Sequence, residues 1–254
     1  MKKSIRLACA ALVGTALCAA SVQAKEVKVL FSFALVPYVI NTPGQEASGF
    51  EYEIMKAALA AKGHTIKPSF VAMGAIPKML KDGAADGAQR GNPDLREGDG
   101  YFYADDATVT YQDVAISLKK SNVSINGVGD LKGKSIVTFQ GASNFMGPEF
   151  AAAVKDNPNY SELSDEKRKV LQLFAGGVQA YIGDLNVFKY YKAQAAGADT
   201  TQEVVIHKVF APSNLQTNHA VFRDKQLRDD FNAGLKQLKT SGQYKAIVKK
   251  YINE

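Results

Sequence analysis

The chain has 254 residues, of which 46% are hydrophobic and 22% are charged, and its formal net charge at pH 7 is +6. This length allows one large domain or two small lobes. Because the Lys and Arg residues are interspersed with acids, the chain lacks the clustered basic surface of a nucleic-acid-binding protein.

Residues 1–24 have the pattern of a secretory signal peptide. A basic start is followed by an apolar run over residues 7–20 and by small residues three and one positions before Lys25, where we expect cleavage. The apolar run is short and rich in alanine, and no later segment approaches the ~20 apolar residues that a membrane span needs. Cleavage would remove three positive charges and no acid, so the net charge would fall from +6 to +3.

Both cysteines, Cys9 and Cys18, lie within this leader. The cleaved chain would have none, which excludes disulfide bonds, thiol catalysis and thiolate metal sites. Cys18 does not fit a lipid-attachment site, because the large Leu17 stands where a small residue is needed. An exported chain without cysteine or anchor indicates a bacterial periplasm.

The first half of the cleaved chain alternates strands with helices. In chain order, the hydrophobic pattern predicts a strand at 27–33, a turn at 41–44, a helix from about 48 to 61, a strand at 65–71, a helix at 76–81 and a strand at 84–89. This alternation indicates βαβ units and a mostly parallel sheet. Ligands of such sheets bind beyond the carboxyl ends of the strands, here in residues 31–38 and 89–96.

The segment after the third strand holds Arg90 and Arg96 on either side of a Gly91-Asn92-Pro93 corner. Asn92 before Pro93 is typical of a helix start, since Asn caps free N–H groups and Pro suits the first helical position. Backbone donors and both guanidinium groups would then converge on one anionic group. The alternative is a surface turn with two solvated arginines.

The second half continues the alternation. An irregular aromatic stretch at 101–110 is followed by predicted strands at 111–118 and 135–139, a helix at 164–175, a strand at 178–184, a helix at 185–195, a strand at 201–210, a return crossing at 218–222 and closing helices from 224 to 251. The polar residues 119–129 indicate an exit into a second lobe.

Two positions in this half are candidate ligand contacts. Gly141-Ala142-Ser143-Asn144 follows a strand as a helix N-terminus able to hold an anion, or as an ordinary turn capped by Ser143 or Asn144. Asp184 ends a strand at its carboxyl end, where it either contacts a ligand or caps the next helix.

Catalytic and metal-binding patterns are absent from the sequence. It contains no G-x-S-x-G, P-loop or dinucleotide fingerprint. His64, His207 and His219 lack metal-ligand spacing and are expected in the core or at the surface. Glu51 and Glu53 lie in a predicted first helical turn, where the helix dipole favours acids. We therefore expect no catalytic residue, metal or other cofactor.

Several short motifs follow one another along the cleaved chain. They are V-P-Y (36–38), G-F-E-Y-E (49–53), D-G-A-A-D-G (82–87), Q-G-A-S-N (140–144), L-F-A-G-G-V-Q-A-Y-I-G-D (173–184) and S-G-Q-Y-K-A-I-V-K-K-Y (241–251). In this order they resemble the type II periplasmic solute-binding proteins, specifically the polar amino-acid-binding group served by ABC importers (bacterial extracellular solute-binding proteins, family 3).

This resemblance implies a two-lobed α/β fold. Each lobe would be a mostly parallel sheet flanked by helices, and two hinge crossings would let the lobes close around one small solute. We assign residues 25–113 and 218–254 to the first lobe and residues 114–217 to the second.

The resemblance also implies site residues. An arginine after the third strand would take the ligand carboxylate, helped by the helix start at Ser143 and Asn144, and Asp184 would take the ligand ammonium group. Arg96 matches the family arginine best. Its loop, however, is about two residues shorter than in the family and has Gln89-Arg90-Gly91-Asn92 in place of the usual Ser and Thr residues, so Arg90 is a rival for the anion.

The first strand and its loop depart from the family pattern. Where family members often carry a polar or acidic residue and an aromatic stacking residue, this chain has Phe31, Ser32, Phe33 and Leu35, with Tyr38 further along the loop. Such a wall favours a ligand with a hydrophobic or aromatic part. Core packing is the alternative for Phe31 and Phe33.

The sequence thus predicts a monomeric periplasmic protein that captures a small zwitterionic or carboxylate ligand, amino-acid-like or an organic acid, and presents it to an ABC permease in the inner membrane. One alternative is a dehydratase-type enzyme on the same fold, with Asp184 or Glu51 as proton donor. Another is a ligand-sensing module that serves a membrane receptor.

Overall fold

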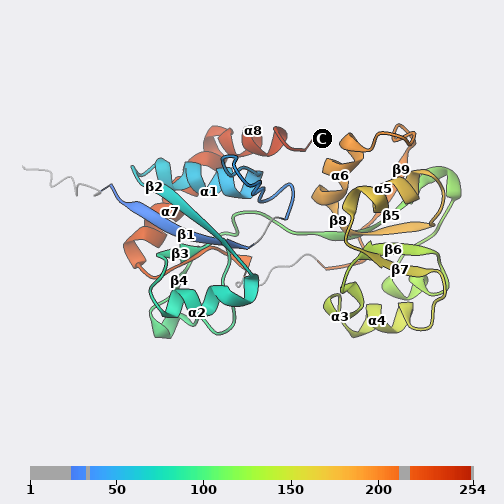
Figure 1. Ribbon diagram of the computed structural model, residues 1–254, viewed down its shortest axis with the longest axis horizontal. Helices are drawn as coiled ribbons and strands as arrows, with labels where there is room; N and C mark the ends of the chain where they lie inside the picture. The colour runs from blue at the N-terminus through green and yellow to red at the C-terminus, as the bar shows by residue number, and fades with distance from the viewer. Residues whose placement is uncertain (1–23, 33–34, 212–217, 253–254) are drawn as a thin grey trace, which may run out of the picture.

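Strands and helices alternate along the chain to build two five-stranded sheets that lie side by side along the long axis of the molecule (Figure 1). The computed structural model describes residues 24–32, 35–211 and 218–252. The expected leader, apart from Ala24, lies outside the described residues. Each sheet with its helices forms one lobe, so the predicted two-lobed α/β fold is confirmed.

The sheet of the first lobe has the strand order β2-β1-β3-β10-β4. Its strands are β1 (Glu26–Ser32), β2 (Thr65–Val71), β3 (Gly87–Ala88), β4 (Phe102–Tyr103) and β10 (Val221–Phe222). β1 runs parallel to β2 and β3, whereas β10 runs antiparallel to β3 and β4. Only β10 is therefore reversed, and the sheet is mostly parallel, as predicted.

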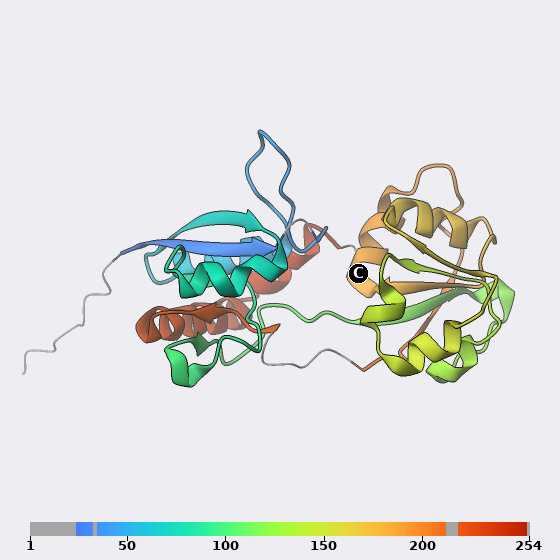
Figure 2. The ribbon, with the colours of Figure 1, turned by 60° about the horizontal axis from the view of Figure 1, so that its bottom comes forward.

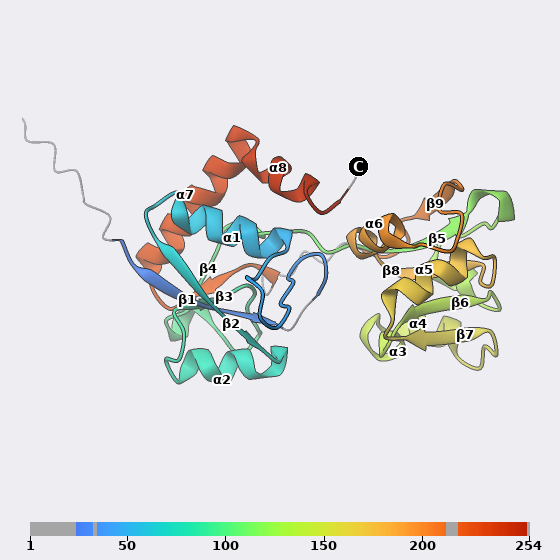
Figure 3. The ribbon, with the colours of Figure 1, turned by 45° about the horizontal axis from the view of Figure 1, so that its top comes forward.

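Helices cover both faces of this sheet (Figure 3). The helices α1 (Phe50–Ala60), α7 (Lys225–Ser241) and α8 (Gln243–Lys249) lie on one face, and α2 (Ile76–Lys81) lies on the other. The apolar residues of α7 recur every three or four positions, so one stripe of the helix is buried against the sheet and α1. The predicted break at Ser241-Gly242 is confirmed, because Gly242 adopts the left-handed conformation with φ 80°.

The second lobe repeats the same plan with the strand order β7-β6-β8-β5-β9. Its strands are β5 (Asp113–Leu118), β6 (Ile136–Phe139), β7 (Tyr160–Leu163), β8 (Ala180–Asp184) and β9 (Val204–His207). Here β5 is the reversed strand, antiparallel to β8 and β9. The helices α3 (Ala142–Phe145) and α4 (Pro148–Val154) cover one face, and α5 (Glu166–Phe174) and α6 (Leu185–Gln194) cover the other.

The reversed strand of each sheet is the one that follows a passage of the chain between lobes. The segment 104–112 runs from β4 in the first lobe to β5 in the second, as the green chain of Figure 2 shows. Because β5 is reversed, its first residue lies level with the last residue of β8, and Asp113 pairs with Asp184. Both acids thus lie at the edge of the second sheet where the parallel strands end.

Several predicted elements differ from the observed ones. β3 and β9 are shorter than the strands predicted at 84–89 and 201–210, and β4, β7 and α4 were not predicted. The proposed helix start at Asn92 and Pro93 is wrong. Asn92 Oδ1 instead accepts a hydrogen bond from the Asp94 N–H at 2.9 Å and closes a turn.

Candidate functional site

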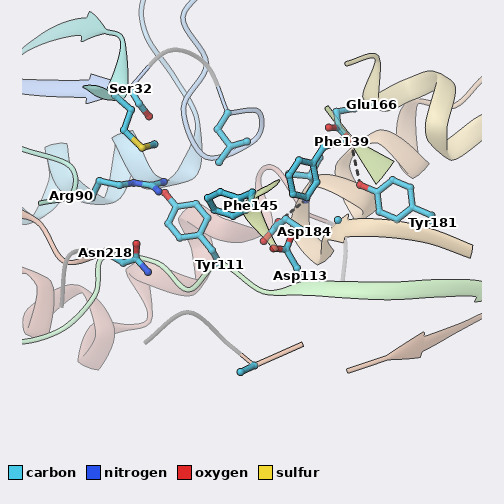
Figure 4. A pocket seen from close by; sticks show the side chains of 15 residues that line it. Ser32, Arg90, Tyr111, Asp113, Phe139, Phe145, Glu166, Tyr181, Asp184 and Asn218 are labelled. Carbon is cyan, nitrogen blue, oxygen red and sulfur yellow. Dashed lines mark hydrogen bonds between the residues drawn. The ribbon is translucent and has the colours of Figure 1, made fainter. Parts of the chain in front are cut away.

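A cavity of about 350 Å³ lies between the lobes, at the ends of the parallel strands of both sheets. Residues of both lobes line it: Ser32, Leu35, Met73, Arg90, Tyr111, Asp113, Phe139, Phe145, Glu166, Tyr181, Gly183, Asp184, Val187, Ala211 and Asn218. This volume lies at the lower end of the range for small-molecule sites, about 300–1,000 Å³. Figure 4 shows Arg90 on one side of the cavity and the carboxylates of Asp113 and Asp184 on the other.

Arg90 follows β3 and carries its guanidinium group to the wall of this cavity. The Nε and Nη2 atoms are buried and have no hydrogen-bond partner among the described residues. The Tyr111 ring lies against the guanidinium group, with 4.3 Å between its centroid and Cζ. Burial by itself would lower the pKa of Arg90, but the nearby Tyr111 and Glu51 outweigh it and raise the pKa. Arg90 is thus a charged donor with unused hydrogens.

The corner after Arg90 is built around Tyr103. The Tyr103 hydroxyl donates to the carbonyls of Asn92 at 3.0 Å and Leu95 at 2.8 Å. A Cβ atom on Gly91 would lie 2.2 Å from the Tyr103 ring, so only glycine fits there. Gly91 and Asn92 therefore shape the turn and do not line the cavity, and Arg96 is exposed and outside the lining.

Gln89 and Phe31, two further candidate ligand contacts, do not line the cavity and contact other parts of the protein. The buried Gln89 side chain accepts from the Ser32 N–H at 3.1 Å and donates to the Ser32 Oγ at 3.2 Å, which ties the end of β3 to the end of β1. Phe31 is fully buried in the core, edge-on to Tyr52 at 5.4 Å. Of the two readings of Phe31, core packing is therefore the one that the structure has, whereas Phe33 lies outside the described residues.

Asp184 caps α6 and also joins the two lobes. Its carboxylate accepts hydrogen bonds from the N–H groups of Asn186 and Val187 and from the N–H of Gln112. The hydroxyl of Tyr38, from the loop after β1, donates to the same carboxylate at 2.8 Å. Burial raises the pKa of Asp184, although these donors oppose the shift. Asp184 therefore caps the helix, as one of the two alternatives predicts, and it also lines the cavity; its contact with a ligand stays a prediction.

Asp113 is a lining acid that the sequence interpretation missed. Its carboxylate accepts no hydrogen bond from the described residues, in contrast with Asp184 beside it. Burial raises the pKa of Asp113 to about 6, and the charges of Asp184 and Glu166 add to the shift. The hydrophobic pattern predicts Asp113 inside the strand at 111–118. Only the reversal of that strand brings it to the ligand edge.

Glu166 lies on the same wall at the first turn of α5. Its carboxylate accepts a hydrogen bond from the buried Lys169 ammonium group at 2.6 Å. It accepts a second from the Tyr181 hydroxyl at 3.3 Å, which Figure 4 shows. Burial lowers the pKa of Lys169. Because Lys169 offsets one of the three acids, the second-lobe wall of the cavity keeps a negative charge.

The helix start at Ser143 and Asn144 is occupied by a side chain of the protein itself. The N–H groups of Gly141 and Ser143 donate to the two carboxylate oxygens of Glu162 at 2.7 and 2.9 Å. Burial alone would raise the pKa of Glu162, but these donors and the Tyr160 hydroxyl lower it to about 2. The N–H groups predicted to hold a ligand anion are therefore already bonded to Glu162. Moreover, neither Ser143 nor Asn144 lines the cavity.

Apolar side chains line the mouth of the cavity. Phe145 is 77% exposed on the second lobe, and Met73 and Leu35 are 49% and 37% exposed on the first. Phe139 packs edge-on to Phe145, with 6.0 Å between the ring centroids. Exposed large apolar side chains gathered at one cavity are typical of a binding surface.

The histidines make ordinary structural contacts. His64 is buried 3.0 Å from the Asp230 carboxylate, and His207 lies 2.9 Å from the Ser117 hydroxyl. In the part of the chain that the structure describes, no three His, Cys, Asp or Glu residues are grouped as metal ligands. Nor is any helix of that part both long and apolar enough to cross a membrane.

The cavity therefore places a cation with two buried nitrogen atoms that lack partners among the described residues on one lobe, opposite acids on the other, between apolar walls. Such an arrangement can hold a small molecule that carries both a carboxylate and an ammonium group. Catalysis by Glu51, the second proton donor considered above, finds no support in this geometry, because Glu51 is fully buried and does not line the cavity.

Comparisons with known proteins agree with the fold. A family model of the bacterial extracellular solute-binding proteins, family 3, matches residues 27–254. No match was found among curated proteins. The substrate-binding protein of a polar amino acid ABC uptake transporter from Streptococcus thermophilus superposes with a TM-score of 0.67 at 17% identity, over 90% of this chain and 86% of that one.

Two further solved structures share the fold. The second substrate-binding domain of a putative amino acid ABC transporter from Streptococcus pneumoniae has a TM-score of 0.65 and 21% identity, over 90% of this chain and all of that one. A histidine kinase sensor domain similar to periplasmic binding proteins has a TM-score of 0.59 and 18% identity, over 89% and 95% of the two chains. With a family model that spans the chain from β1 to its last residue, this protein belongs to the bacterial extracellular solute-binding proteins, family 3.

Proposed function

We propose that this protein captures a small amino-acid-like zwitterion in the periplasm and delivers it to an ABC importer. The opposition of charges across one cavity carries the proposal. Arg90 has two buried nitrogen atoms, Nε and Nη2, without partners in the described part of the chain, and Asp113 and Asp184 face it from the other lobe. A ligand carboxylate on Arg90 would gain charge-assisted hydrogen bonds at a donor that is already desolvated.

The ammonium group of the ligand would contact Asp113 first. Asp184 already accepts hydrogen bonds from Tyr38 and from three backbone N–H groups, so its lone pairs are largely used. The neighbouring Asp113 carboxylate accepts no hydrogen bond from the residues that the structure describes, and the charge of Asp184 adds to the negative potential there.

The apolar mouth favours a ligand with a hydrophobic or aromatic part. Phe139 and Phe145 on one lobe and Leu35 and Met73 on the other would cover such a group as the lobes close. Burial of apolar area would then add about 25 cal/mol per Å² to the binding free energy before ordering costs.

The wider role rests on the family and on the leader. Residues 1–24 would direct export. Residues 25–113 with 218–254 and residues 114–217 are the two lobes predicted to close, except that β5 begins at Asp113 and places this residue in the second lobe. The partner would be a permease of the inner membrane. The family model and the similar structures describe binding proteins and a sensor domain, and we propose no enzymatic activity.

Titration calorimetry of the cleaved chain tests this proposal. The protein is unfolded, dialysed and refolded to remove carried ligand, and is then titrated with single amino acids and organic acids. We expect saturable binding of at least one zwitterion. At a concentration of about 100 Kd, this ligand should stabilise the protein by about 2.7 kcal/mol and visibly raise its melting temperature.

The outcome that contradicts the proposal is a panel in which nothing binds saturably and nothing shifts the melting temperature. Mass spectrometry of the natively purified protein provides the independent measurement, since a co-purified molecule identifies the ligand class directly.

A sensory role is the second candidate, because a histidine kinase sensor domain shares this fold over most of both chains. Pull-down with detergent-solubilised inner membranes separates the two roles. Recovery of a permease supports delivery, and recovery of a receptor kinase supports sensing.

A further inference from the structure

Glu51 is a buried carboxylate that the proposed binding contacts do not use. It lies in the first turn of α1, is fully buried, and does not line the cavity. Its neighbour Glu53 differs, because it is partly exposed and bonds Lys250 at 2.7 Å. An acid within a folded lobe needs a compensating charge or hydrogen bond.

Tyr111 links Glu51 to the cavity wall. Its hydroxyl donates to Glu51 Oε2 at 2.5 Å, while Oε1 is buried and has no partner among the described residues. The other side of the tyrosine faces the cavity, where its ring lies 4.3 Å from Arg90 Cζ. The hydrogen bond therefore fixes the ring that covers the guanidinium group.

The Tyr111 ring also contacts Tyr38. Tyr111 stacks on Tyr38 with 4.5 Å between the centroids, and Tyr38 bonds Asp184 of the second lobe. Tyr111 belongs to the segment 104–112 that passes between the lobes. A shift of Tyr111 would thus disturb both the guanidinium group and the contact between the lobes.

The charges of Glu51 and Arg90 depend on each other. Burial raises the pKa of Glu51 to about 6, although the Arg90 charge and the Tyr111 hydrogen bond hold the rise back. The same carboxylate is one of the groups that raise the pKa of Arg90. Glu51 is thus a counter-charge of Arg90 in its own lobe.

We propose that Glu51 is a positioning residue for Arg90: it holds Tyr111 against the guanidinium group and supplies the counter-charge of that group while the cavity is empty. This inference rests on the proposed role of Arg90 as the anion site. An anion bound to Arg90 brings a second negative charge near Glu51, which raises the pKa of Glu51 further. Anion binding and proton uptake by Glu51 are therefore coupled.

The sign of the coupling follows from linkage. Because the bound state has the higher Glu51 pKa, affinity for an anion is lowest at a pH above that value. The affinity increases as the pH falls toward about 6. At lower pH Glu51 is protonated in the free protein as well, so the affinity no longer changes. Each unit by which the anion raises the pKa of Glu51 is worth about tenfold in affinity.

The other groups around Glu51 are Arg90, Tyr111 and, on α8, Tyr244, whose pKa is raised by burial and by Glu51. The two tyrosines do not titrate near pH 6. Asp113 does, and its effect on a zwitterion is opposite, because an ammonium group binds the ionised carboxylate better. The test therefore uses trifluoroacetate, an anion without an ammonium group that stays ionised throughout this pH range. Protonation of Asp113 would also favour a bare anion as the pH falls, so the parent of this comparison and each of its variants carry Asp113→Asn.

The experiment measures trifluoroacetate binding by ¹⁹F NMR at pH 5.5 and pH 7.5. For the parent protein we expect binding to be about threefold to tenfold tighter at pH 5.5. Glu51→Gln should remove this difference while it preserves the shape of the side chain. The matched control Glu53→Gln, two residues along the same helix, should behave as the parent. A parent-like pH dependence in Glu51→Gln would overturn the proposal.

A second measurement needs no ligand, so it separates this inference from the proposed function. The Glu51 carboxyl group is titrated by ¹³C NMR in the parent, in Arg90→Gln and in Tyr111→Phe. Loss of the cation or of the hydrogen bond should raise the Glu51 pKa in each variant. An unchanged Glu51 titration in both variants refutes the coupling, whether or not any amino acid binds to the parent.

Discussion

Two arginines six positions apart have different surroundings. Arg90 lies largely buried at the cavity wall with a tyrosine ring over its charge, and its Nε and Nη2 atoms have no hydrogen-bond partner within the described ranges. Arg96 is exposed beyond the Tyr103 turn and does not line the cavity. The match to the family by loop position favours Arg96. Burial and hydrogen-bond capacity favour Arg90.

Alanine variants distinguish the two arginines. Arg90→Ala should weaken binding of a zwitterion by about 100-fold or more, because a charged partner of a buried carboxylate is lost. Arg96→Ala should change the affinity by less than about twofold, as expected for a solvated charge. Titration calorimetry with the tightest-binding amino acid of the panel measures both, and equal losses would contradict this assignment.

The Glu162 side chain occupies the two backbone N–H groups that were predicted to bind a ligand anion. The turn after β6 presents two N–H groups as the sequence pattern predicts, but the carboxylate of Glu162 already accepts both bonds. Glu162 stands at the end of β7, a strand that the sequence analysis did not identify. We therefore expect a ligand carboxylate to bind Arg90 and not this turn.

At the scale of elements, the first lobe depends on a close crossing of α1 and α7. A Cβ atom on Gly234 would lie 1.9 Å from the carbonyl oxygen of Ala58, so the two helix backbones touch at this point. This contact positions α1, which carries Glu51 in its first turn. Packing in the helix layer thus determines the geometry behind the cavity wall.

Gly234→Ala tests this crossing. The added methyl group must push the helices apart, and we expect a loss of about 3 kcal/mol in the free energy of unfolding, or roughly 10 °C in melting temperature. Gly98→Ala is the control, because its added Cβ meets nothing within 4 Å and its backbone needs no positive φ. Circular dichroism melts of the two variants should therefore differ. A Gly234→Ala melt equal to that of the parent would contradict the packing argument.

At the scale of the whole molecule, two lobes of like plan face each other across a cavity with opposite charges on its walls. A ligand that bridges Arg90 and Asp113 would favour approach of the lobes. The open cavity exposes Phe145, Met73 and Leu35, and closure would bury them.

Energy transfer between dyes measures this closure. The only cysteines are Cys9 and Cys18, so a cleaved chain carrying Lys81→Cys and Glu149→Cys can be labelled at α2 and α4 alone. We expect transfer between these exposed positions to increase when the bound zwitterion is added. A pair within the second lobe, Lys120→Cys with Glu149→Cys, should not respond, and an unresponsive pair across the lobes would contradict closure.

The local patterns of the sequence were sufficient for much of the fold. Strand β2 and helix α2 coincide with the predicted ranges, and the division of the closing helices at Gly242 does too. These features depend on hydrophobic period and on turn residues that act within a few positions. Strand β4 was not predicted because its two residues are too few to show a hydrophobic period. They form a strand only because β10 pairs with them.

The sequence by itself determined the family, the two-lobed plan and the loops that flank the cavity, because ordered motifs and hydrophobic period are properties of the chain. Only the tertiary structure decided which side chains those loops present. Asp113 reaches the cavity because β5 runs antiparallel to its neighbours. Glu51 in α1 accepts the hydrogen bond of the Tyr111 hydroxyl, whose ring covers Arg90, and Phe31 lies in the core. Strand direction and burial arise from contacts between residues far apart in the chain, and no local pattern encodes them.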